Sequence, residues 1–195
     1  MVERGINIPE LLDGISAPDG WRVEFVEGEI TVSPLPGGPH NVLGGAIQEE
    51  FTWHFRRLGL SYQARMCFGF CSTASCSDTQ KGDHVIPDVA VMTRPLTSAE
   101  LKACGHGWVS RAALDLVVEV TSSNRTADTV AKVKVYGRMA IPHYLLVDRR
   151  DRVTTLSTEP TGDIFDPGYA AKQVFAFGDD ITLPDPYPIL ETEAW

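Results

Sequence analysis

The sequence predicts an α/β fold in which a mixed β-sheet is flanked by helices and an N-terminal β-hairpin precedes the rest. Three features predict this class: strand-like alternation near the N-terminus, near-continuous apolar runs in the second half, and two segments with helical spacing. Because strands and helices interleave along the chain, they favour a layered arrangement. The 195 residues suit a single domain spanning 1–195 with a substantial core.

In the first half, residues 7–15 are expected to form a short amphipathic helix. Residues 21–34 alternate around Glu27-Gly28, which is typical of a β-hairpin. Residues 40–58 have helical spacing, and the side predicted to face the core carries Val42, Ala46, Ile47, Phe51 and Phe55. One strand is expected over residues 61–71, followed by a polar loop.

In the second half, the apolar segment 85–92 is expected to be one short strand, and 95–108 a short helix and turn. The run 114–123 predicts a central strand covered on both faces. A helix over 125–140 follows, with Asn124 or Thr126 as its cap. The last elements expected are a buried strand over 143–148, its antiparallel neighbour over 152–158, and small edge strands near the C-terminus.

The chain is acidic, with a formal net charge of -9 and a pI near 5.0. This charge argues against a surface that holds nucleic acid by phosphate neutralisation alone. It does not exclude a metal-dependent nuclease, because a bound cation reverses the local charge of a carboxylate site. No apolar run is long enough to cross a bilayer, and residues 1–14 do not resemble a signal peptide, so we expect a cytoplasmic protein.

The four cysteines are Cys67, Cys71, Cys76 and Cys104, and they include no Cys-x-x-Cys pair. A zinc site would need sulfur ligands about 2.3 Å from the metal. Cys67 and Cys71 would lie about 13 Å apart on an extended strand, too far to share one ion. We therefore expect reduced thiols and no metal cage, with a zinc-binding interaction protein as the less favoured alternative.

Two carboxylates occur where burial is expected: Asp88 within the segment 85–91 and Glu119 within 116–120. An unpaired buried carboxylate is costly, so each needs a partner. A single such acid is most simply paired with an arginine or used to cap a turn. Two of them, followed by a lysine on the next helix, are better explained by a shared cation.

That lysine is Lys132, which a helical wheel places on the apolar side of the helix expected after Glu119. Val130, Val135 and Tyr136 share this side, whereas Lys134 falls on the opposite, polar side. Lys132 is thus expected to face the sheet. The alternative is a lysine whose alkyl stem lies on the core while its ammonium reaches solvent.

These residues lie in segments that resemble a large bacterial family, the putative restriction endonucleases of the PD-(D/E)-x-K superfamily. The hairpin VEFVEGEITVSP followed by His40, the segment PDVAVM, and the run LDLVVEVTSSNRTADTVAKVKVYGRMAIPHYLLVD are similar to its motifs, over residues 22–148. The resemblance implies a restriction-endonuclease-like core. It also implies site positions at Glu24, Asp88, Glu119 and Lys132, with His40 as a weaker candidate.

The sequence departs from the superfamily pattern at Thr121, where a lysine usually stands two residues after the glutamate. Relatives in the family are thought to supply a lysine from the following helix, which agrees with the wheel position of Lys132.

The expected function is a metal-dependent endonuclease that hydrolyses phosphodiester bonds of DNA. Asp88 and Glu119 would hold Mg²⁺ or Mn²⁺ through oxygen atoms. Lys132 would orient the attacking water and stabilise negative charge, and Glu24 would be a further ligand or position a metal-bound water. The alternative is a catalytically inactive nuclease-fold protein that serves as a binding or assembly module. A homodimer is compatible with cleavage of two strands, but the sequence leaves the oligomeric state open.

Overall fold

The structure, a computed structural model, describes residues 7–73, 82–103, 107–121, 127–163, 165–193 and 195. The chain forms two compact units, and each combines three separate stretches of sequence. The first unit comprises residues 1–35, 69–86 and 96–113; the second comprises 36–68, 87–95 and 114–195. A single domain over 1–195 stays a prediction, favoured by the fact that neither unit is a continuous stretch.

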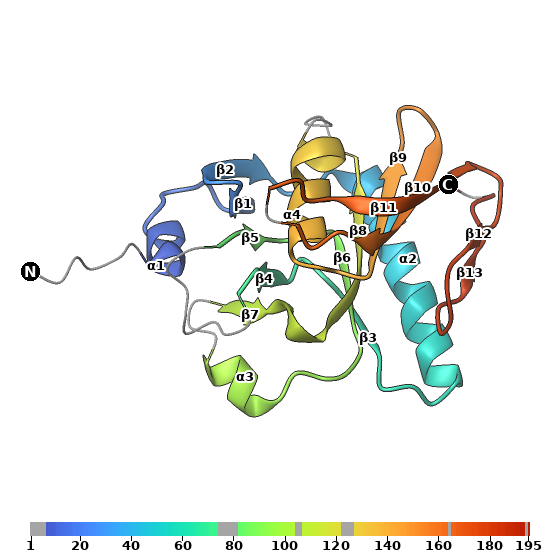
Figure 1. Ribbon diagram of the computed structural model, residues 1–195, viewed down its shortest axis with the longest axis horizontal. Helices are drawn as coiled ribbons and strands as arrows, with labels where there is room; N and C mark the ends of the chain where they lie inside the picture. Colours follow the sequence, from blue (N-terminus) through green and yellow to red (C-terminus); the bar gives the residue numbers. More distant parts are fainter. Residues whose placement is uncertain (1–6, 74–81, 104–106, 122–126, 164, 194) are drawn as a thin grey trace, which may run out of the picture. The chain divides into compact units, whose positions relative to one another are not determined.

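The first unit is built around a five-stranded sheet in the order β2-β1-β5-β4-β7 (Figure 1). Its elements are α1 (Ile8–Asp13), β1 (Trp21–Val26), β2 (Glu29–Pro34), β4 (Gly69–Cys71), β5 (His84–Val85), α3 (Ser98–Ala103), β7 (Trp108–Ser110) and the 3₁₀ turn η2 (Arg111–Ala113). Ile8 and Leu12 of α1 pack with Trp108, Val23 and Phe25 of the sheet. The short amphipathic helix predicted near the N-terminus is confirmed.

The predicted hairpin is also confirmed, because β1 and β2 pair antiparallel from Trp21↔Pro34 to Val26↔Glu29. Glu27 and Gly28 both have positive φ, 52° and 86°, as the turn of a two-residue hairpin requires. Asp83 fixes this turn by accepting a hydrogen bond of 2.7 Å from the backbone N–H of Glu27.

The second unit is built around a six-stranded sheet in the order β11-β10-β9-β8-β6-β3. Its elements are α2 (Gly38–Arg57), β3 (Gln63–Met66), β6 (Val89–Met92), β8 (Leu114–Val120), the π-helical turn η3 (Ala127–Ala131), α4 (Lys132–Arg138), β9 (His143–Asp148), β10 (Val153–Pro160), β11 (Tyr169–Ala176), β12 (Ile181–Thr182) and β13 (Ile189–Leu190). Only β8 and β9 are parallel among the described strands of this sheet, so the mixed sheet is confirmed.

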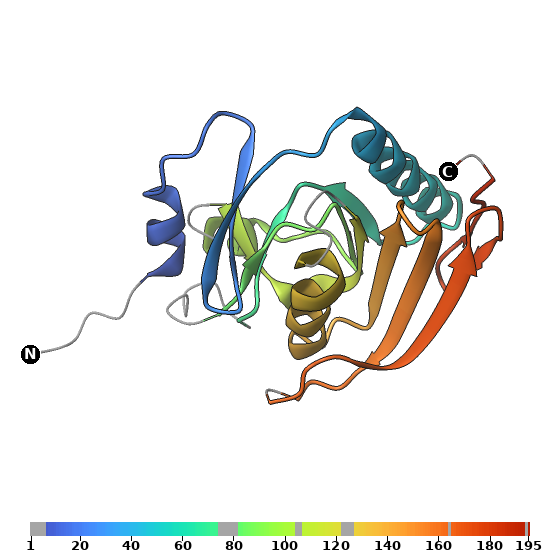
Figure 2. The same ribbon diagram turned by 90° about the horizontal axis from the view of Figure 1, so that it is seen from above.

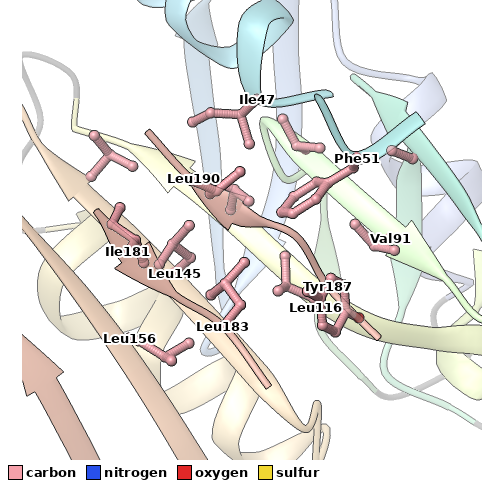
Figure 3. Packing of buried hydrophobic residues seen from close by; sticks show 14 of the residues in the cluster. Ile47, Phe51, Val91, Leu116, Leu145, Leu156, Ile181, Leu183, Tyr187 and Leu190 are labelled. Atoms are coloured by element: carbon pink, nitrogen blue, oxygen red, sulfur yellow. The ribbon is translucent and has the colours of Figure 1, made fainter. Parts of the chain in front are cut away.

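Helices α2 and α4 cover opposite faces of this sheet (Figure 2). Val118 and Val120 of β8 point into the core beneath α2, which also contains Ile47 and Phe51. Figure 3 shows Leu183, Tyr187 and Leu190 from the C-terminal segment packed into the same cluster. Side chains alternate between the two faces of a strand, so the residue between Val118 and Val120 must face α4.

Two predicted strands are wrong as single elements. The strand predicted over 61–71 divides into β3 and β4, which belong to different sheets, and Cys67 between them has a positive φ of 51° that ends the extended chain. The strand predicted over 85–92 divides into β5 and β6, again in different sheets. Pro87 explains this division, since it has no N–H to continue a ladder.

The faces of the two helices also differ in part from the prediction. Val42 is 73% exposed and Ala46 is exposed, because the buried face of α2 runs through Leu43, Ile47, Phe51 and Phe55. Val130 is exposed because it lies in the π-helical turn, where a rotation of 100° per residue does not apply. The proposed caps Asn124 and Thr126 lie outside the described residues.

Near the C-terminus, one edge strand is longer than the predicted small strands: β11 pairs with β10 over nearly its whole length, from Tyr169 to Ala176. Within the described part of the chain, no helix combines the length and the apolar character needed to cross a membrane.

The C-terminal segment is anchored to the second unit by Tyr187. Its ring packs with Phe51 and Phe55, and its hydroxyl donates a hydrogen bond to Asp115 Oδ2. His143 Nδ1 lies 3.6 Å from the same oxygen. Burial raises the pKa of Asp115, but hydrogen bonds from His143 and Tyr187 and the charge of His143 outweigh it, so the pKa lies below its usual 3.8.

Replacing Tyr187 with Phe should reduce the free energy of unfolding by about 1–2 kcal/mol near neutral pH. The pKa of Asp115 is lower in the folded than in the unfolded protein. The stability that the ionised Asp115 carboxylate contributes is therefore complete above about pH 4 and is lost as the pH falls through the folded pKa. Urea melts between pH 3 and 7 should show the Tyr187→Phe cost shrinking at low pH. Tyr169→Phe is the control, since its hydroxyl donates to the backbone oxygen of Ile141, and its cost should not vary with pH.

Gly137 allows α4 to approach the β10–β11 connection. A Cβ atom at Gly137 would lie 2.5 Å from the backbone oxygen of Gly168, so Gly137→Ala should destabilise the fold by about 2 kcal/mol or more. Gly45 in α2 has no atom within 4 Å of the corresponding position, and Gly45→Ala should stabilise by up to about 1 kcal/mol. Thermal melts in which Gly137→Ala and Gly45→Ala lose the same amount of stability would contradict this packing.

Candidate active site

The candidate site of the second unit lies where β6 begins and β8 ends. Strands β6 and β8 pair antiparallel with Val89 opposite Val118. Asp88 directly precedes β6, and its carboxylate accepts the backbone N–H of Val120, the residue after Glu119. The two acids are both buried, at 3% and 1% exposure.

Asp88 contacts a side chain of α2 and a backbone group of β8. His40 Nε2, near the start of α2, forms a hydrogen bond of 2.7 Å with Asp88 Oδ2. The same oxygen accepts the backbone N–H of Val120 at 2.9 Å. His40 is buried, so the long helix α2 brings an imidazole to a carboxylate 48 residues further along the chain. His40, the weaker candidate from the resemblance, therefore contacts the proposed site directly.

Glu119 is held by two side chains of α4. Lys132 Nζ lies 2.9 Å from Glu119 Oε1, and the Tyr136 hydroxyl donates to this oxygen at 2.6 Å. Lys132 and Tyr136 are four residues apart and therefore share one side of the helix. Lys132 is only 6% exposed, whereas Lys134 is exposed, as the helical wheel predicts.

Thr121 occupies the usual lysine position and has a different task. Its hydroxyl donates to Asp148 Oδ1 at 3.4 Å and accepts the backbone N–H of Arg149 at 3.1 Å. Asp148 Oδ1 also accepts the N–H groups of Arg150 and Asp151. Thr121 thus joins β8 to the turn after β9, and the ammonium group beside Glu119 comes from α4 instead.

Glu24 lies in the first unit and is buried, at 4% exposure. Its Oε1 accepts the backbone N–H of Ile86 at 2.7 Å, and Arg22 donates through a guanidinium nitrogen to the backbone oxygen of Ile86 at 3.1 Å. Arg22 is not among the site residues predicted from the sequence. Its contact could not be predicted, because a side chain bound to a backbone group 64 residues away leaves no periodic pattern.

The donor set of the second unit fits a hydrated divalent cation better than a metal enclosed by protein. The described residues contain no cluster of three or more His, Cys, Asp and Glu side chains suited to a metal ion. Mg²⁺ is commonly bound through one or two carboxylates and keeps several waters, so Asp88 and Glu119 are the appropriate ligand type.

The cysteines give no support to a zinc site within the described chain. Cys71 is buried and Cys67 is exposed. Cys76 and Cys104 lie outside the described residues, so the prediction that no metal cage forms stays a prediction.

Comparison with known proteins agrees with this architecture. A solved structure described as a "putative nuclease belonging to DUF820 from Anabaena variabilis" has a TM-score of 0.65 and 15% sequence identity, covering 96% of each chain. At this identity the likeness shows the fold alone, and it confirms the predicted fold class. No curated protein matches the chain. The model of the family Uma2, "Putative restriction endonuclease", matches residues 9–193, and the chain therefore belongs to this family.

Proposed function

We propose that this protein is a divalent-metal-dependent endonuclease that hydrolyses phosphodiester bonds of DNA, with Asp88 and Glu119 as the ligands of Mg²⁺ or Mn²⁺. The observation that carries the proposal is the buried contact between Lys132 and Glu119 on the strand next to Asp88. Families with the restriction-endonuclease-like fold generally use divalent metal ions, which is consistent with two buried carboxylates near the end of β8.

The chain's own residues have distinct tasks in this reaction. When bound, the metal would neutralise phosphate charge and make a water molecule more acidic. Lys132 orients the attacking water and stabilises negative charge that develops on the phosphate. Tyr136 holds the Glu119 carboxylate by its hydrogen bond to Oε1, and His40 does the same for Asp88. Cleavage of both DNA strands would suit a homodimer, because two sites related by two-fold symmetry match the duplex.

A second candidate function is a catalytically inactive module that keeps the nuclease fold. The net charge of -9 favours it, since the chain has few cations with which to neutralise a phosphate backbone. A titration with Mn²⁺ separates the two functions. The nuclease should lose its metal binding on Asp88→Asn, whereas an inactive module need not bind the ion at all.

Lys132 and Lys134 should behave differently, although only one residue separates them. Lys132→Ala should abolish metal-dependent cleavage of plasmid DNA, while Lys134→Ala should change it little, because Lys134 faces solvent. Without metal, Lys132→Ala should also cost about 3 kcal/mol of stability, since it leaves the buried Glu119 without its cation.

Added Mn²⁺ should restore the thermal stability of Lys132→Ala more than its activity, because the ion can replace the lost charge but not the lysine's role in orienting water. Equal loss of cleavage in the two variants would exclude the assigned role of Lys132. Absence of cleavage by the wild type on any nucleic acid would favour the inactive module.

A further inference from the structure

The second unit contains a stretch whose charge is opposite to that of the chain as a whole. Residues 51–68, which comprise the C-terminal part of α2 and the strand β3, contain Arg56, Arg57 and Arg65 but no aspartate or glutamate. All 26 acidic residues of the chain therefore lie outside this stretch. The three arginines are exposed, so they form a local positive surface on an acidic protein.

A tryptophan is exposed in the same stretch. Trp53 is 58% exposed, and the guanidinium carbon of Arg57 lies 4.8 Å from the centroid of its ring. Arg57 follows Trp53 by four residues, so the two side chains share one side of α2. The ring thus combines a cation beside it with a large surface that is open to solvent.

Arg65 of β3 lies beside the same helix. Gln48 of α2 donates a hydrogen bond to the backbone oxygen of Ala64 at 3.4 Å, and Arg65 donates to this oxygen at 3.0 Å. A second guanidinium nitrogen of Arg65 donates to Gln63 Oε1 at 2.9 Å. Both acceptors are neutral, so these contacts orient Arg65 without neutralising its charge.

Exposed arginines next to an exposed aromatic ring match the chemistry of single-stranded nucleic acid. Arginine binds phosphate oxygens through paired N–H groups. An unpaired base stacks on an aromatic side chain, whatever its identity, because every base has a flat π-face. The bases of a duplex are already stacked on one another, so the open ring of Trp53 fits an unpaired base better than a paired one.

We propose that Trp53, Arg56, Arg57 and Arg65 form a basic patch that binds single-stranded DNA, with Trp53 stacking on an unpaired base and the arginines contacting neighbouring phosphates. This inference deepens the proposed function and rests on it for DNA as the ligand. A local patch lets an acidic protein hold DNA, because the phosphates respond mainly to charges within about 10 Å at ordinary salt concentrations.

Helix α2 connects the basic patch to the candidate active site. Its N-terminal part supplies His40, which contacts Asp88, and Trp53 lies 13 residues further along the same helix. At 1.5 Å per residue, His40 and Trp53 are about 20 Å apart along the helix axis. The basic patch is therefore a separate contact for the nucleic acid and not a part of the metal site.

Three variants separate stacking from charge. Trp53→Ala removes the ring, Trp53→Phe keeps a smaller ring, and Arg57→Gln removes one positive charge. Lys172→Gln is the matched control for the charge, because Lys172 is also exposed in the second unit but lies on β11. All four positions are exposed or half-exposed, so the variants should fold, which circular dichroism can check.

The measurement is fluorescence anisotropy of a labelled 12-nucleotide oligothymidylate in EDTA, at salt concentrations from 25 to 200 mM. Trp53→Ala should weaken binding at least about fivefold with an unchanged salt dependence, and Trp53→Phe should stay within about threefold of the wild type. Arg57→Gln should reduce the slope of log K against log salt by about 0.7, the loss of one phosphate contact on a single strand. Lys172→Gln should leave affinity and slope unchanged.

A 12-base-pair duplex tests the stacking role of Trp53 directly. Trp53→Ala should leave duplex binding unchanged, because paired bases do not offer a free face. Equal losses on duplex and single strand would overturn the stacking role. The whole inference fails if the wild type binds the oligothymidylate more weakly than about 0.1 mM at 25 mM salt, or if Lys172→Gln weakens binding as much as Arg57→Gln.

The inference and the proposed nuclease function can fail separately. A wild type that binds the oligothymidylate through Trp53 but cleaves no nucleic acid with Mn²⁺ would contradict the nuclease and support the basic patch as the DNA contact of an inactive module. A wild type that cleaves DNA, with Trp53→Ala and Arg57→Gln binding as tightly as it does, would overturn the basic patch alone.

Discussion

The buried contact of Glu119 with Lys132 and Tyr136 is the interaction on which the rest of the second unit depends. A carboxylate with 1% exposure in a central strand would be strongly destabilising without a cation and hydrogen bonds. Both come from one helix turn of α4, so α4 must pack on the face of the sheet from which Glu119 projects. Gly137 permits that packing, because its lack of a side chain lets α4 meet the backbone of Gly168.

Strand β8 serves the core and the candidate site at once. Val118 and Val120 pack beneath α2, while Glu119 between them faces α4. The backbone of the same strand also contributes, since the N–H of Val120 binds Asp88. Because Glu119 and the Val120 N–H sit on one strand between β9 and β6, the central ladder of the sheet sets the positions of these two groups.

The sequence could predict those elements whose periodicity extends over several turns or alternations. The hairpin, β8 and the inward direction of Lys132 were predictable for this reason. The prediction failed where one residue interrupts a run, as at Cys67 with its positive φ and at Pro87. Short apolar runs do not indicate whether they form one strand or two. The contact of Glu24 with the backbone of Ile86 was not predictable, because a backbone group has no residue-type pattern.

Three of the buried carboxylates, Glu24, Asp88 and Glu119, contact different kinds of group. Glu24 accepts a backbone N–H, Asp88 accepts a backbone N–H and contacts an imidazole, and Glu119 contacts an ammonium and a phenol. An acid whose task is to accept a backbone hydrogen bond needs an oxygen atom, and an amide can supply it. An acid that a lysine neutralises needs its charge, and a metal cation can replace the lysine electrostatically. Lys132 already places a positive charge 2.9 Å from Glu119, so the surroundings of this carboxylate accommodate a cation.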